Sequence, residues 1–267
     1  MRIKTGAAIF AVAAAVFGIA AGSARADLKL EQTVETKGAD PFLIFAGAEP
    51  PKTGKTRTKT ISYYKGDRRR VETNGVTRLF DDANNTFTVL NPRAKTYFVV
   101  DTAKEIVSAD KGVVPEFVGA ADVVDTAETK RVNGKEARHY RYTVTVRMTL
   151  PGSKSPLATF TMKGDQWASE SVGGPVGNPK QSRFAILAAL PPQYSSGLKP
   201  IAEKMATIKG FVLEETQSTT LASLLQTETP KEPYQSVTKT DAISEAPLPD
   251  ALFLPPPDYK KVDPPRS

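Results

Sequence analysis

The chain contains no cysteine, one histidine (His139) and one tryptophan (Trp167). The absence of cysteine excludes disulfides, a thiol nucleophile, thiolate zinc sites and iron–sulfur ligation. A single histidine excludes every site that needs two imidazoles from one chain, including the HExxH zinc centres. These absences remove several large classes of enzyme, and the sequence indicates no metal or other cofactor.

Long apolar runs are also scarce, because the 267 residues contain a single one, from Ala7 to Ala21. Arg2 and Lys4 precede this run, and the small residues of Ala24-Arg25-Ala26 follow it. This order predicts a secretory signal peptide over residues 1–26, cut after Ala26; the alternative is an alanine-rich buried helix. No later segment has the roughly 18 consecutive apolar residues of a membrane span. We therefore expect a periplasmic or secreted mature chain without a transmembrane segment.

The excess of positive charge is small for a chain of this length. The sequence has 36 Lys and Arg against 29 Asp and Glu, a formal net charge of +7. Three of the positive charges, Arg2, Lys4 and Arg25, lie in the expected signal peptide. Such a modest excess does not indicate nucleic-acid binding, and we expect no nucleic-acid partner.

Alternation of apolar and polar residues dominates the sequence after residue 27 and predicts β-strands. Asn74-Gly75 separates two of these segments, and both residues accept the positive φ of a type I′ hairpin turn. A similar turn is expected at Val132–Lys135. The short connections favour an antiparallel meander. The expected strands are 28–36, 56–64, 68–73, 76–81, 86–90, 96–100, 121–130, 136–148, 157–162, 166–170, 211–220 and 237–245.

Helical signals are fewer. They predict short helices at 103–110, after Pro115, at 179–190 and at 198–209. The last of these has a single apolar stripe formed by Leu198, Ile201, Met205 and Ile208, and Gly210 provides its left-handed end. No linker is long enough to divide the chain, so we expect one domain over residues 27–246. A proline-rich tail, residues 247–267, either packs on this domain through Leu252, Phe253, Leu254 and Tyr259 or extends from it.

Several local phrases, taken in their order along the chain, resemble one family. The phrases are YYKGDRRR (63–70), LFDD (79–82), NPRAKTY (91–97), DQWAS (165–169), IKGFV (208–212) and PDALF (249–253). They are similar to an uncharacterised branch of the bacterial lipoprotein-carrier (LolA-like) superfamily of exported proteins. The resemblance implies a mainly-β α+β fold, a curved antiparallel half-barrel sheet covered by short helices. In lipoprotein carriers the apolar hollow of this fold holds acyl chains.

The expected ligand-binding residues lie in the meander. Tyr63, Phe87 and Tyr97 are aromatic candidates for the wall of a hollow; the alternative is an ordinary filled core. Arg69 points away from Arg68 and Arg70, because side chains alternate along a strand. Arg69 could meet an anionic head group on the concave face; alternatively, the arginines form surface ion pairs with Glu72 and Asp67.

Other polar groups have structural interpretations. His139 has no GxSxG serine and no recognisably placed acid, so it is interpreted as structural or on the surface. The Asp81–Asn85 cluster is typical of a turn rather than of a calcium loop. Glu214 and Glu215 are adjacent on a strand and face opposite ways, so they form no glycosidase dyad. Trp167 is expected to pack in the core beneath the following helix.

Taken together, these features predict a non-enzymatic, periplasmic binding protein. Its ligand would be apolar or amphipathic: acyl chains, a lipid or a lipidated protein sheltered in the hollow of a curved sheet. The alternative is an envelope structural or interaction protein with a filled core, which docks a protein partner through the tail or through the 41–51 loop.

Overall fold

The computed structural model describes residues 27–41, 54–84, 86–101, 115–172, 196–224 and 232–264. The expected signal peptide over residues 1–26 lies outside these residues. So do the expected helices at 103–110 and 179–190, and all of the 41–51 loop except Pro41. These four features stay predictions.

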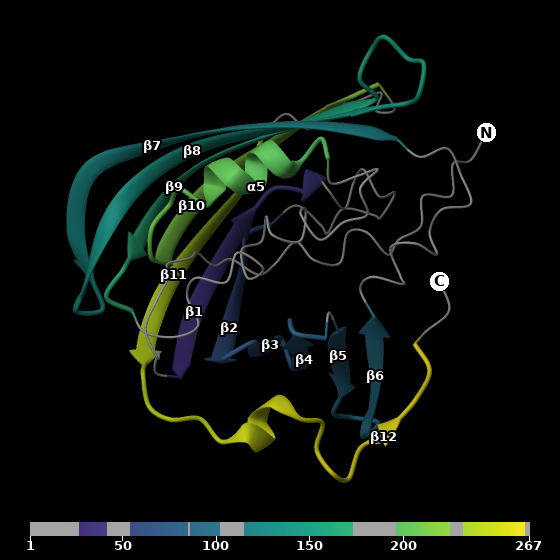
Figure 1. Ribbon diagram of the computed structural model, residues 1–267, viewed down its shortest axis with the longest axis vertical. Helices are drawn as coiled ribbons and strands as arrows, with labels where there is room; N and C mark the ends of the chain where they lie inside the picture. The colour runs from purple at the N-terminus through teal and green to yellow at the C-terminus, as the bar shows by residue number, and fades with distance from the viewer. Residues whose placement is uncertain are drawn as a thin grey trace.

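The described residues form one large, open, curved β-sheet (Figure 1). Its strand order is β12-β6-β5-β4-β3-β2-β1-β11-β10-β9-β8-β7. Every pairing is antiparallel except that of β12 with β6. The strands are β1 Leu28–Lys37, β2 Thr56–Lys65, β3 Arg68–Thr73, β4 Val76–Asp81, β5 Thr86–Asn91, β6 Thr96–Asp101, β7 Glu116–Val132, β8 Lys135–Thr149, β9 Ala158–Ser169, β10 Phe211–Ser223, β11 Tyr234–Ser244 and β12 Lys260–Lys261.

The tight connections follow directly from the sequence. At the β3–β4 turn Asn74 and Gly75 have φ values of 51° and 75°, and at the β7–β8 turn Asn133 and Gly134 have 48° and 76°. Two consecutive positive φ values are the signature of a type I′ turn, whose twist matches that of the flanking strands. Both expected hairpins are confirmed.

Helix α5, Lys199–Met205, lies inside the curve of the sheet (Figure 1). Its apolar stripe is confirmed, but the helix is shorter than the expected 198–209. After Met205 the hydrogen bonds run three residues back, from the Thr207 amide to the Lys204 carbonyl and from Ile208 to Met205. The Thr207 hydroxyl also donates to the Lys204 carbonyl, which competes with helical continuation. Gly210 then adopts φ 89°, as expected.

One expected element is wrong. No helix follows Pro115, because β7 begins at Glu116 and pairs with β8 along its length. Phe117, Ala121 and Val123 of β7 pack against the core under α5. A Cβ atom on Gly119 would come within 2.5 Å of Ile201 Cδ1. A larger residue at this strand position would therefore displace the Ile201 side chain of the docked helix.

The C-terminal segment, defined here as residues 247–262, packs on the sheet. It contains the 3-10 helix η3, Asp250–Phe253, and ends alongside β6, where the Lys260 and Val262 amides donate to the Lys95 and Tyr97 carbonyls. Of its expected apolar contacts, Phe253 is 6 % exposed but Leu254 is 55 % exposed. No helix among the described residues is long and apolar enough to cross a membrane.

Candidate functional site

The two faces of the sheet have different surroundings. We call the face that carries α5 the inner face and the opposite one the outer face. Because paired residues share a face, the strand registers assign each side chain to one of them. The row Tyr64–Arg69–Phe80–Phe87–Val100 crosses β2 to β6 on the inner face. The row Tyr63–Arg70–Leu79–Thr88–Val99 crosses the same strands on the outer face.

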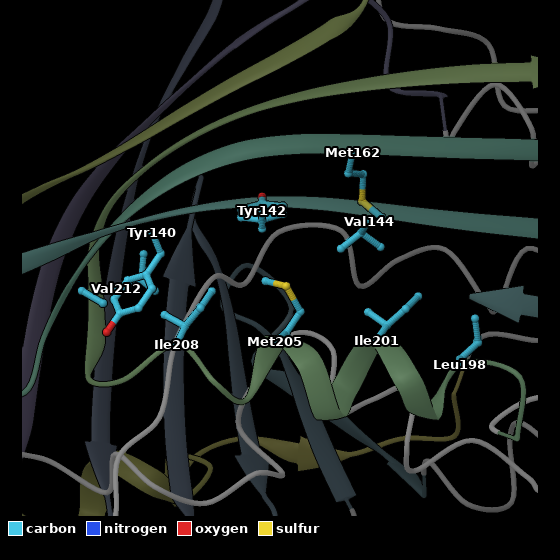
Figure 2. Close-up of a cluster of buried hydrophobic side chains, with 10 residues drawn as sticks. Tyr140, Tyr142, Val144, Met162, Leu198, Ile201, Met205, Ile208 and Val212 are labelled. Atoms are coloured by element: carbon cyan, nitrogen blue, oxygen red, sulfur yellow. The ribbon is translucent and has the colours of Figure 1, made fainter. Parts of the chain in front are cut away.

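The inner face beneath α5 is an apolar core. Figure 2 shows the side chains of the helix stripe directed toward those of β8, β9 and β10. The buried members of this cluster are Tyr140, Tyr142, Val144, Met162, Ala168, Leu198, Ile201, Met205, Ile208 and Val212. Burial of this stripe fixes α5 over one part of the inner face.

Next to this core, the inner face carries a buried carboxylate. Glu215 on β10 is 2 % exposed. Its Oε1 accepts hydrogen bonds from the Tyr142 hydroxyl at 2.7 Å and from Gln166 Nε2 at 2.6 Å. Tyr142 reaches Glu215 from β8 by crossing β9 above Gly164, where a Cβ atom would lie 2.6 Å from Tyr142 Cζ. Gly164 is therefore required for this contact.

The polar character extends over the middle of the inner face. Gln32 Nε2 donates to the Thr240 hydroxyl, which in turn donates to the Leu213 carbonyl. Gln217 Nε2 donates to the Thr219 hydroxyl. The inner face is therefore polar rather than apolar at these positions of β10 and β11. In the middle of these strands, polar residues alternate with other polar residues rather than with apolar ones. Glutamine, glutamate and threonine therefore face inward.

Beyond the polar centre, the inner face of β2 to β6 carries aromatic residues and an arginine. Arg69 is 9 % exposed, and its guanidinium lies over the Phe80 ring at 4.1 Å from the centroid. Phe80 and Phe87 are cross-strand neighbours with centroids 6.0 Å apart. Among the described residues, Arg69 Nε has no hydrogen-bond partner. Phe80 and Phe87 are only partly buried, so this region can offer apolar surface.

The four expected ligand-binding residues do not form one site. Arg69 and Phe87 lie on the inner face, as a ligand site requires, whereas Tyr63 and Tyr97 lie on the outer face. Grouping Phe87 with Tyr63 and Tyr97 is wrong. Phe87 pairs directly with Phe80, so it lies on the inner face with Phe80 and not on the outer face with the two tyrosines. This register depends on the length of the 82–85 turn, which alternation within one strand does not reveal.

The neighbours of Arg69 form ion pairs on the outer face. Arg70 Nε contacts Glu72 at 2.6 Å, as one interpretation of the sequence expected. Arg68 contacts Asp250 of the C-terminal segment at 2.6 Å, and Arg70 donates to the Leu252 carbonyl. Arg68 and Arg70 therefore make structural contacts on the outer face. Arg69 is the one residue of this arginine run that faces inward.

His139 is structural, as one of its two interpretations expected, but the expectation that no acid is placed to orient it is wrong. His139 is 8 % exposed and has an acid at each ring nitrogen: Glu128 Oε2 at 3.2 Å from Nδ1 and Asp165 Oδ1 at 3.0 Å from Nε2. The Thr126 hydroxyl also lies 3.1 Å from Nδ1. Asp165 comes from β9, 26 positions away, and is brought close only by the β8–β9 pairing.

Trp167 belongs to this outer-face cluster. Its ring stacks on His139 with centroids 4.5 Å apart, and Lys130 lies over it at 4.3 Å. The ring faces away from α5, but it packs against a buried hydrophobic cluster that includes Val132 and Ala137, as the expected core position requires. The helix expected to follow Trp167 lies outside the described residues. Lys130 also pairs with Glu214 beside a pocket of about 210 Å³ lined by Trp167 and Lys239. Cations and carboxylates alternate here, which is typical of a solvated sheet face.

His139 fixes a bulge in the edge strand β7, where the register with β8 shifts between Asp125 and Thr129. We expect His139→Phe to keep the stack on Trp167 but to lose the ring-nitrogen contacts with Thr126, Glu128 and Asp165. The bulge amides should then exchange faster with deuterium, and the free energy of unfolding should fall by about 1 kcal/mol. Arg141→Gln is the matched control on the same strand and face. Equal exchange in both variants would show that His139 does not hold the bulge.

Two smaller interpretations are confirmed. Both carboxylate oxygens of Asp81 accept hydrogen bonds from Asn84, as in a turn. Glu215 is buried on the inner face, whereas Glu214 pairs with Lys130 on the outer face. In the part of the chain that the structure describes, no three His, Asp or Glu residues are arranged to hold a metal ion.

No protein-family model and no curated protein matches this chain. The functional argument therefore rests on the geometry of the inner face.

Proposed function

We propose that this chain is an exported, non-enzymatic binding protein that shelters an apolar or amphipathic ligand on the inner face of its sheet. The observation that carries the proposal is the aromatic row of Phe80 and Phe87 beside Arg69, on the inner face of β2 to β6. No described helix packs on this region, whereas α5 packs on β7 to β10. Partly buried aromatic rings on a concave surface are typical of ligand sites.

Burial of apolar surface provides the driving force for such binding. Removing apolar surface from water stabilises a complex by about 25 cal/mol per Å². An acyl chain that buries on the order of 300 Å² thus gains about 7 kcal/mol, before the cost of association is subtracted. The sheet needs no covalent chemistry to retain such a ligand.

We also propose that the chain is a LolA-like protein. An open, curved, antiparallel sheet with a helix on its inner face supports this assignment, because the resemblance of its sequence phrases implies that arrangement. The polar centre around Glu215 distinguishes this chain from a wholly apolar hollow and favours an amphipathic ligand over a purely apolar one.

The alternative function, docking of an envelope protein through the tail, has less support. The C-terminal segment already contacts its own sheet through Lys65, Arg68 and Arg70. A partner that bound this segment would first have to replace those contacts.

Two measurements test the proposed function. Protein purified from an exported fraction should release a lipid or other apolar ligand on organic extraction, detected by mass spectrometry. It should also bind a fluorescent fatty acid, and Phe87→Ala should weaken this binding about tenfold, or about 1.4 kcal/mol. Tyr63→Ala, on the outer face, is the matched control and should bind normally. Absence of both extracted ligand and probe binding would rule the function out.

A further inference from the structure

We propose that Arg69 binds the anionic head, a carboxylate or a phosphate, of the amphipathic ligand. This inference rests on the proposed function, and it names the chemical class of the ligand. Its starting point is a buried arginine on the inner face whose Nε has no hydrogen-bond partner among the described residues.

Arginine is suited to this task because its planar guanidinium presents several N–H donors to two oxygens at once. A buried donor is normally paired, so an unpaired Nε indicates a position where an acceptor is expected. Arg69 lies over Phe80, which is followed along the row by Phe87. An amphiphile could therefore place its anion on Arg69 and its apolar part on the aromatic rings.

The charges on the β2 to β6 part of the inner face agree with an anionic head, whereas Glu215 lies on β10. The inner face of β2 to β6 carries Arg69 and a second arginine, Arg78. Arg78 lies on β4 and pairs with Val71, two residues after Arg69 on β3. The inward positions of these five strands contain no Asp or Glu. Asp82, which follows β4, is an acid whose charge acts on the Tyr64 hydroxyl.

Tyr64 completes the surroundings of Arg69. The two residues are cross-strand partners, and the charge of Arg69 acts on the Tyr64 hydroxyl. Burial raises the pKa of the Tyr64 phenol well above its ordinary value, although the Arg69 charge opposes this. Tyr64 therefore stays neutral and adds no negative charge that would repel an anion.

The outer face provides the contrast. Arg70, the next residue, pairs with Glu72 at 2.6 Å and donates to Leu252 of the C-terminal segment. Its guanidinium is thus committed to structural contacts. Arg70 is the natural control for Arg69, because the two share a strand and a residue type but not a face.

The experiment compares ligands of equal chain length and different heads. Laurate, dodecyl phosphate and dodecanol are tested for displacement of the neutral fluorescent probe N-phenyl-1-naphthylamine. The wild type should bind the two anions at least about tenfold more tightly than the alcohol. Arg69→Met should remove this preference, Arg69→Lys should retain part of it, and Arg70→Met should leave it intact. Thermal unfolding of each variant establishes that it is folded. If Arg69→Met is not folded, Arg69→Lys is used in its place.

The outcomes separate this inference from the proposed function. Equal binding of all three ligands by the wild type, or a preserved preference in Arg69→Met, overturns the role of Arg69 while leaving the function standing. Displacement by none of the three overturns the function itself. Inorganic phosphate should not weaken laurate binding; competition would show that Arg69 takes a free anion and would overturn its assignment to an amphiphile.

Discussion

Replacing Phe253 by alanine should release the C-terminal segment from the sheet. Phe253 is 6 % exposed and lies beneath Arg68, whose guanidinium is 5.3 Å from the ring centroid. Loss of a buried phenylalanine costs about 3 kcal/mol, which lowers the protection of the segment by about two powers of ten. Hydrogen exchange at the Lys260 and Val262 amides measures this release directly, because both donate to β6 carbonyls.

Leu254→Ala is the matched control for this experiment. Leu254 is the next residue but is 55 % exposed, so its truncation should leave exchange at Lys260 and Val262 nearly unchanged. Equal effects of the two variants would show that Phe253 does not anchor the segment. The opposite result, faster exchange only in Phe253→Ala, identifies a single apolar anchor within a proline-rich tail.

The ionisation of the acid that pairs with Arg68 and Lys65 does not change at neutral pH, so it does not affect the hydrogen-exchange comparison. Hydrogen bonds from Arg68 and then Lys65 lower the pKa of Asp250 below its ordinary value. The stabilisation that Asp250 provides is therefore complete above the ordinary carboxyl pKa and is lost only as the pH falls through the lowered value. Asp250 thus stays ionised throughout the neutral range, so a change in its charge does not contribute to the difference between the variants.

The strands of this fold could be predicted because their signals are local. Period-two alternation and the two Asn-Gly turns located most of the β-meander to within two residues, as a comparison of 68–73 and 76–81 with β3 and β4 shows. The helix stripe on Leu198, Ile201, Met205 and Ile208 was equally visible, since it repeats at helical spacing.

Other features depend on contacts between distant residues. The segment after Pro115 has no strong periodicity and contains Gly119, so only its pairing with β8 and the presence of α5 explain why it is a strand. The sequence around His139 indicates no acid that would orient its ring, because Asp165 lies 26 positions away. Pairing registers, which no single segment specifies, created both of these sites.

Only the part of the candidate ligand site that depends on a single strand was predictable from the sequence. Alternation within β3 correctly separated Arg69 from Arg68 and Arg70. It could not decide which aromatic residues of β5 and β6 share the face of Arg69, because each intervening turn can change the register. Phe80 was therefore missed as the partner of Arg69, although a register that joins Phe80 to Phe87 would have identified it.

Replacing Gly164 by valine should be among the most damaging single changes in the sheet. Valine ordinarily favours a strand over glycine, so propensity alone predicts stabilisation. The structure predicts the reverse, because a Cβ atom would lie 2.6 Å from the ring of Tyr142. The ring must move, and the buried Glu215 then loses the hydrogen bond that it accepts from Tyr142. Overpacking and this loss together should lower the free energy of unfolding by about 3 kcal/mol.

A double-mutant cycle tests the cause as well as the size of this effect. In a Tyr142→Leu background the ring that meets the new side chain is absent, so Gly164→Val should cost much less than in the wild type. Denaturant unfolding of the four proteins gives the coupling free energy. A cost of Gly164→Val that is equal in both backgrounds would show that Tyr142 is not the obstacle. A large difference would establish that one glycine allows a tyrosine to cross a whole strand and reach a carboxylate on the next.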